Sequence, residues 1–120
     1  MKLRISGNSL RLRLTRSEVE EFAETGSYEN SIDLAGGSLA YRLARTDGDS
    51  LTASLSGNAI TVSVPAGEAD RWTGSEDIGI EAPDHGGLKI VIEKDFACLN
   101  RREGEDTDDH YPHPATGAAC

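Results

Sequence analysis

The sequence lacks the features that mark membrane and secreted proteins. No apolar run among its 120 residues approaches the about 20 residues needed to span a membrane. The N-terminus passes directly into alternating apolar and charged residues, without the apolar region of a signal peptide. These absences predict a cytoplasmic protein with no membrane partner.

Cysteine and positive charge are also scarce. The two cysteines, Cys98 and Cys120, are too few for a disulfide framework, and in a reducing compartment they usually remain thiols. Twelve basic residues stand against 21 acidic ones, which gives a formal net charge of -9. Because general nucleic-acid binders depend on a positive surface field, this balance argues against a nucleic-acid partner.

Motifs that specify enzymes are missing as well. The sequence contains no G-x-S-x-G elbow, phosphate-binding loop, Rossmann glycine pattern or H-E-x-x-H. Glu93 and Asp95 share one face of a predicted strand, and paired carboxylates can perform acid/base chemistry. Strand alternation alone also places such residues on an exposed face, so an enzyme is the least favoured hypothesis.

The most strongly patterned stretch is Lys2 to Leu14, KLRISGNSLRLRL. Apolar and charged residues alternate on both sides of Gly7-Asn8, which predicts a β-hairpin with a two-residue turn. One face then holds four cations: Lys2, Arg4, Arg11 and Arg13. Because like charges opposite each other destabilise a ladder, this face should be answered by anions from the chain, from a partner protein or from a small anion.

Local signals predict the remaining elements. Thr15 and Glu18 have the capping-box spacing that starts a helix, which we place at about residues 15–25. Period-two alternation from Ser27 to Pro65 predicts four strands in an antiparallel meander, and a short helical turn can form from Pro65 to Trp72. Two more strands follow, over about residues 77–81 and 88–96.

We therefore expect a β-rich α+β fold. The predicted architecture is an antiparallel sheet of about seven to eight strands, curled into a sandwich or open barrel, with one packed helix. The segment Ser56-Gly57-Asn58 repeats Ser6-Gly7-Asn8, and we interpret this as repeated turn chemistry rather than a duplicated domain. Residues 1–99 form the domain, and residues 100–120 form an acidic tail containing histidine and proline that folds back on it.

The tail carries two candidate sites. Four soft or borderline ligands could surround Zn²⁺ or another transition metal, namely Cys98, His110, His113 and Cys120, although their spacing matches no zinc finger or ribbon. Five acids form a cluster: Glu103, Glu105, Asp106, Asp108 and Asp109. This cluster could bind Ca²⁺, remain a solvated charge block, or cover the cationic hairpin face.

Two motifs resemble those of a small bacterial family that is catalogued as a domain of unknown function. The first is K-L-R-I-x-G-N-S-L-R-L-R-L at the start, and the second is E-K-D-F-x-C-L-x-x-R-x-x-E-D-x-D from Glu93, followed by Pro112 and Pro114. The resemblance implies a small β-rich bacterial protein and brings no functional residues with it. Our leading hypothesis is thus a non-enzymatic binding or interaction module. The alternatives are a metal-binding protein and, last, a small hydrolytic or transfer enzyme.

Overall fold

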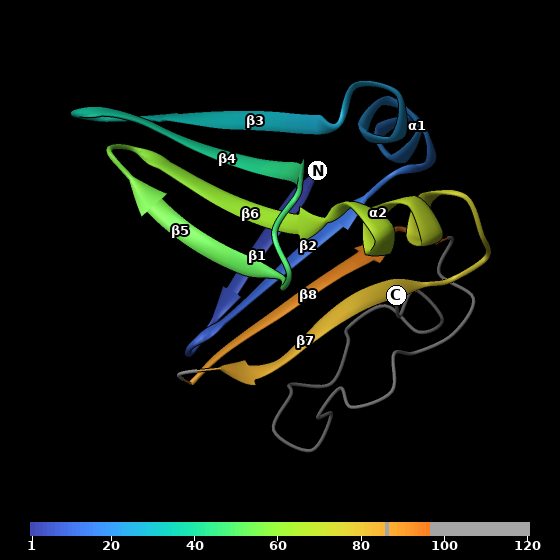
Figure 1. Cartoon of the computed structure of the whole chain (residues 1–120). Helices are drawn as coiled ribbons and strands as arrows, with labels where there is room; N and C mark the ends of the chain where they lie inside the picture. The colour runs from blue at the N-terminus through green and yellow to red at the C-terminus, as the bar shows by residue number, and fades with distance from the viewer. Residues whose placement is uncertain (86, 97–120) are drawn as a thin grey trace, which may run out of the picture.

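The computed structural model describes residues 1–85 and 87–96, and these residues form eight strands and two helices. In chain order the elements are β1 (Lys2–Ser6), β2 (Ser9–Leu14), α1 (Arg16–Thr25), β3 (Ser27–Leu34), β4 (Gly37–Thr46), β5 (Thr52–Ser56), β6 (Ala59–Pro65), α2 (Ala66–Thr73), β7 (Gly79–His85) and β8 (Leu88–Lys94). The strands form two four-stranded sheets, ordered β1-β2-β8-β7 and β3-β4-β6-β5. Figure 1 shows the two sheets diverging toward their hairpin turns, with both helices at the opposite end.

The prediction of a β-rich fold is confirmed, but the prediction of one curled sheet with one helix was wrong. There are two open sheets, and α2 forms a second helix where the sequence suggested a helical turn. The antiparallel meander was also wrong, because β4 pairs with β6 in parallel. These two strands carry fully buried Leu43, Val62 and Val64. Parallel pairing puts both of them in the centre of the sheet and leaves the more exposed β3 and β5 at its edges.

The two halves of the chain repeat one order of elements: hairpin, helix, hairpin. Ile5 lies opposite Leu10 in the first hairpin, and Leu55 lies opposite Ile60 in the corresponding hairpin, 50 positions further on. The same spacing of 50 relates the buried helix residues, Val19 to Ala69 and Phe22 to Trp72. The repeat therefore extends well beyond the shared Ser-Gly-Asn turn.

The halves exchange hairpins with each other. Each sheet contains the first hairpin of one half and the second hairpin of the other half, joined by the parallel pairs β2 with β8 and β4 with β6. Each Ser-Gly-Asn turn makes the same contact to its neighbour. The Asn8 carbonyl accepts the Lys89 N–H at 3.1 Å, and the Asn58 carbonyl accepts the Ala40 N–H at 2.8 Å. Neither sheet therefore belongs to one half alone.

The helices close one end of the space between the sheets. Thr15 and Glu18 form the predicted capping box of α1, and Gly26 ends the helix with φ of 83°, a conformation that glycine adopts without strain. Phe22 and Trp72 meet edge to face with ring centroids 6.2 Å apart. Both rings belong to the core, which consists of Met1, Leu12, Leu14, Val19, Phe22, Leu43, Leu51, Val62, Val64, Ala69, Trp72, Ile80, Ala82, Ile90 and Ile92.

Candidate functional site

The cationic face of the β1-β2 hairpin has the predicted register. Lys2 lies opposite Arg13 and Arg4 lies opposite Arg11, with Leu3 and Leu12 paired on the inner side. Like charges directly opposite each other cost up to about 1 kcal/mol per pair unless they are compensated. The structure supplies part of that compensation from an unexpected strand.

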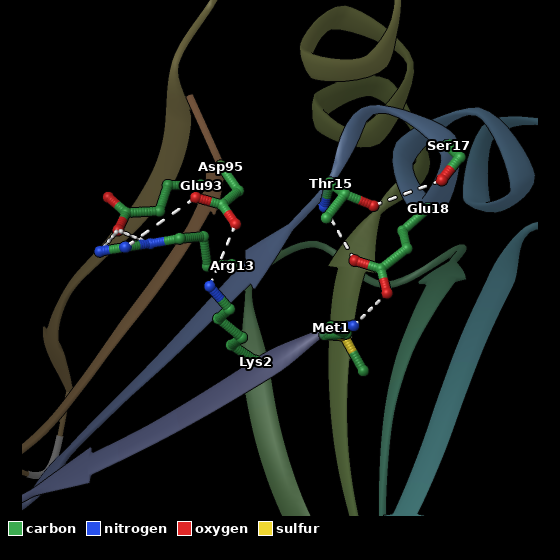
Figure 2. A network of polar contacts seen from close by, with 8 residues as sticks. All are labelled: Met1, Lys2, Arg13, Thr15, Ser17, Glu18, Glu93 and Asp95. Atoms are coloured by element: carbon green, nitrogen blue, oxygen red, sulfur yellow. Dashed lines mark hydrogen bonds and ion pairs between the residues drawn. The ribbon is translucent and has the colours of Figure 1, made fainter. Parts of the chain in front are cut away.

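Two carboxylates, from β8 and the residues that follow it, form ion pairs with cations of the β1-β2 hairpin. Glu93 Oε1 lies 3.2 Å from Arg13 Nη2 and 3.5 Å from Arg11 Nη1. Asp95 lies 4.0 Å from Arg13 Nη1 and 3.4 Å from Lys2 Nζ. The Glu93 and Asp95 side chains are 11% and 19% exposed, so these contacts are screened less than pairs on an open surface. Figure 2 shows Lys2 and Arg13 converging on the two carboxylates.

This arrangement gives Glu93 and Asp95 a structural role. The parallel register of β2 with β8 places Glu93 beside Arg13, and the Asp95 N–H donates to the Leu14 carbonyl at 2.7 Å. Both side chains, which the sequence offered as an acid/base pair, therefore lie in ion pairs with cations of the hairpin. The geometry favours charge compensation within the sheet over catalysis.

Arg4 differs from the other three cations. It is exposed on the edge strand β1, and within residues 1–85 and 87–96 no ion pair to it is found, whereas Lys2, Arg11 and Arg13 all have one. Its cross-strand neighbour is Arg11, which is drawn toward Glu93 on the far side. The positive charge of Arg4 is thus left at the edge of the sheet.

A second polar network ties the start of the chain to α1. The buried α-ammonium group of Met1 donates to Glu18 Oε2, and the Thr15 N–H donates to Glu18 Oε1 at 2.8 Å (Figure 2). The Tyr41 hydroxyl donates to the Met1 carbonyl at 3.2 Å. Burial by itself raises the pKa of Glu18, but the hydrogen bonds from Met1 and Thr15 and the charge of the Met1 ammonium outweigh it and hold that pKa below its ordinary value of 4.5.

The end of the molecule opposite the helices is open and apolar. A pocket of about 260 Å³ lies between the turn of β1-β2 and the β5-β6 hairpin. Its lining is Ile5, Gly7, Asn8, Ser9, Leu10, Ala53, Ser54, Leu55, Ile60 and Leu88. Ile5 and Leu55 are 59% and 72% exposed although both belong to the inward-facing rows of their strands. Ile32 and Leu34, on the corresponding row of β3, are also exposed.

Sequence reasoning missed this pocket because it assigned every inward-facing aliphatic residue to an ordinary core. The signal was present in the repeat. Ile5 and Leu55 occupy equivalent positions next to the two Ser-Gly-Asn turns, and both side chains line the pocket where the sheets diverge.

The remaining predicted site residues lie outside the described residues. These are the metal candidates Cys98, His110, His113 and Cys120 and the acidic cluster Glu103, Glu105, Asp106, Asp108 and Asp109. Within the part of the chain that the structure describes, no group of three or more histidine, cysteine, aspartate or glutamate side chains is arranged to hold a metal ion. No helix there is long and apolar enough to cross a membrane.

Comparisons with known proteins add one match. A family model described as "Family of unknown function (DUF7009)" matches residues 1–115. No curated protein and no solved structure matches the chain.

Proposed function

The chain belongs to this family of unknown function, and we propose from its geometry that it is a non-enzymatic binding module that holds an apolar segment of a partner protein. The binding surface is the open end between the sheets. The observation that carries the proposal is the pocket between the β1-β2 turn and the β5-β6 hairpin, where Ile5 and Leu55 expose most of their surface.

The asymmetry of the two ends supports this assignment. At one end α1 and α2 cover the space between the sheets, and Phe22 and Trp72 are 1% and 0% exposed. At the other end the apolar rows continue past the covered core without a covering element among the described residues. Apolar side chains gathered at such an opening are typical of a surface that a partner covers.

The size of the pocket favours a protein side chain over a small molecule. Its volume of about 260 Å³ is below the roughly 300–1,000 Å³ of most small-molecule sites. One or two aliphatic or aromatic side chains fit this space. A second copy of the chain is the less favoured occupant, because each copy carries a net charge of -9 and the copies repel each other.

A peptide-binding experiment tests the proposal. Short extended peptides are selected from a library on the full chain, and the dissociation constant of the best peptide is measured by fluorescence anisotropy. Leu55→Asp should weaken binding by roughly 10- to 100-fold, because burying one leucine side chain is worth about 1.5–3 kcal/mol and 1.4 kcal/mol corresponds to tenfold.

Ile78→Asp is the matched control. Ile78 is 63% exposed and its carbonyl accepts the indole N–H of Trp72, so it lies at the end that the helices close. This variant should bind the peptide as the wild type does. Equal weakening by both variants, or peptides that bind the Leu55→Asp variant unchanged, would contradict a site at the open end.

A further inference from the structure

We infer that the acidic segment of this same chain, residues 103–109, docks along the free edge of β1 and supplies the negative charge that Arg4 lacks. This inference concerns the outer edge of the hairpin and does not depend on the pocket. Three observations lead to it: the order of charges across the sheet, the unpaired backbone of β1, and the place where the described chain ends.

Beside the hairpin, the outer face of the sheet carries acids on one side of the four cations. β8 and its continuation contribute Glu93 and Asp95, and the next strand, β2, contributes Arg11 and Arg13, which pair with those carboxylates. The outermost strand, β1, adds the positive charge of Arg4 with no anion beyond it in the described residues. A segment carrying acids next to β1 would give the two cationic strands an acidic neighbour on each side.

The backbone of β1 has hydrogen-bonding groups on its outer edge that such a segment could pair with. Ser6 and Ser9 flank the two-residue turn and form a hydrogen-bonded pair. Because such pairs alternate along the ladder, the backbone N–H and C=O groups of Lys2 and Arg4 also point toward β2. Leu3 and Ile5, which alternate with them, direct their N–H and C=O groups away from β2. Among the described residues β1 pairs only with β2, which leaves these groups on an open edge that can accept an added strand.

The chain is within reach of this edge. Asp95 Oδ2 lies 3.4 Å from Lys2 Nζ, so the described chain ends close to the beginning of β1. From Asp95 to Glu103 the chain can extend up to about 26 Å at roughly 3.3 Å per residue. Arg4 is two residues from Lys2, or about 7 Å along the strand. A tethered segment also acts at an effective concentration in the millimolar range, which favours it over a separate acidic partner.

The internal repeat supplies a matched control strand. β5 is the equivalent edge strand of the second sheet, with the same turn and the same register. Thr52 and Ser54 stand where β1 has Lys2 and Arg4. Ala53 and Leu55 therefore direct their N–H groups to an open edge that carries no cation, and an acidic segment has no reason to prefer it.

Amide hydrogen exchange on the full chain, followed by NMR, tests the inference. The Leu3 and Ile5 amides should exchange at least tenfold more slowly than those of Ala53 and Leu55. Replacing the five acids Glu103, Glu105, Asp106, Asp108 and Asp109 by glutamine or asparagine should remove the difference, and raising the salt concentration should reduce it. Equal exchange at the two edges of the wild type would overturn the inference, as would protection that survives the loss of the acids.

Swapping the charges of Arg4 and the acidic segment adds a second test, in which the expected result is restored protection and not only its loss. Arg4→Glu alone should speed the exchange of the Ile5 amide. Combining Arg4→Glu with Glu103→Lys and Glu105→Lys should restore the protection. A combined variant that stays unprotected while its other β1-β2 amides remain protected would show that charge pairing at Arg4 does not hold the segment.

Discussion

Glu18 joins two parts of the chain through one carboxylate. Its Oε1 closes the capping box with Thr15, and its Oε2 receives the buried ammonium group of Met1. A capping box by itself needs only the first of these contacts. The second contact fixes the start of β1 against α1, so this residue connects a helix end to an edge strand.

The pKa of Glu18 gives this contact a pH dependence. Because the pKa lies below 4.5 in the folded state, the ionised carboxylate stabilises the fold above that value, and this contribution is lost as the pH falls through the lowered folded-state pKa. Glu18→Gln should reduce the free energy of unfolding by about 1.5–3 kcal/mol at pH 7, the range for hydrogen bonds to a charged group. The difference from the wild type should shrink toward pH 3. Urea unfolding at both pH values measures it, and a constant difference would contradict a role for the charge.

At the scale of elements, the close pairing of β7 with β8 depends on Gly79. This glycine is needed for lack of space, since its backbone is not in the left-handed conformation. Gly79 lies opposite Glu93, and a Cβ atom there would come 2.5 Å from the Ile92 carbonyl oxygen and 3.3 Å from Glu93 Cβ. The oxygen belongs to the backbone of a paired strand and cannot rotate away. The position therefore excludes any side chain, because β7 would have to move off β8 to make room for one.

Gly79→Ala should lower the free energy of unfolding by roughly 2–3 kcal/mol, in the range of substitutions that strain a core element. Gly67→Ala in α2 is the control, because a Cβ atom at Gly67 meets nothing within 4 Å and alanine favours a helix by up to about 1 kcal/mol. Thermal unfolding should move the two variants in opposite directions. Two alanine variants of equal stability would argue against close backbone contact at Gly79.

Individual elements could be predicted from the sequence because their signals are local. The alternation around Gly7-Asn8 gave the register of β1 with β2, and Thr15 with Glu18 gave the start of α1. The partition into two sheets could not be predicted in the same way. The parallel pairs β2 with β8 and β4 with β6 join strands from different halves of the chain, and alternation does not show which strand is the neighbour.

The candidate site shows the same limit. The sequence identified four cations that needed anions and offered the cluster from Glu103 to Asp109, which lies outside the described residues, as one source of them. The structure brings Glu93 and Asp95 to three of those cations, because β8 lies beside β2 in parallel. The spacing of 50 residues between the two Ser-Gly-Asn turns also separates Phe22 from Trp72. Noticing this in the sequence would have indicated two related halves, although not their exchange of hairpins.

At the scale of the whole molecule, the exchange of hairpins makes the two halves depend on each other. Each sheet needs strands from both halves, and the two helices that close one end meet through Phe22 and Trp72. Neither half contains a complete sheet that could remain folded when the other half unfolds. The molecule should therefore unfold in a single step, as small cooperative domains usually do.

The single tryptophan makes this testable, because Trp72 belongs to the second half. Phe22→Ala, in the first half, removes a ring that is 1% exposed and should lower the free energy of unfolding by about 3–5 kcal/mol. If the halves are interlocked, the Trp72 fluorescence transition and the far-UV circular dichroism transition in urea should coincide in the wild type and shift together in the variant. A variant whose circular dichroism changes at a lower urea concentration than its Trp72 fluorescence would show that the first half unfolds independently.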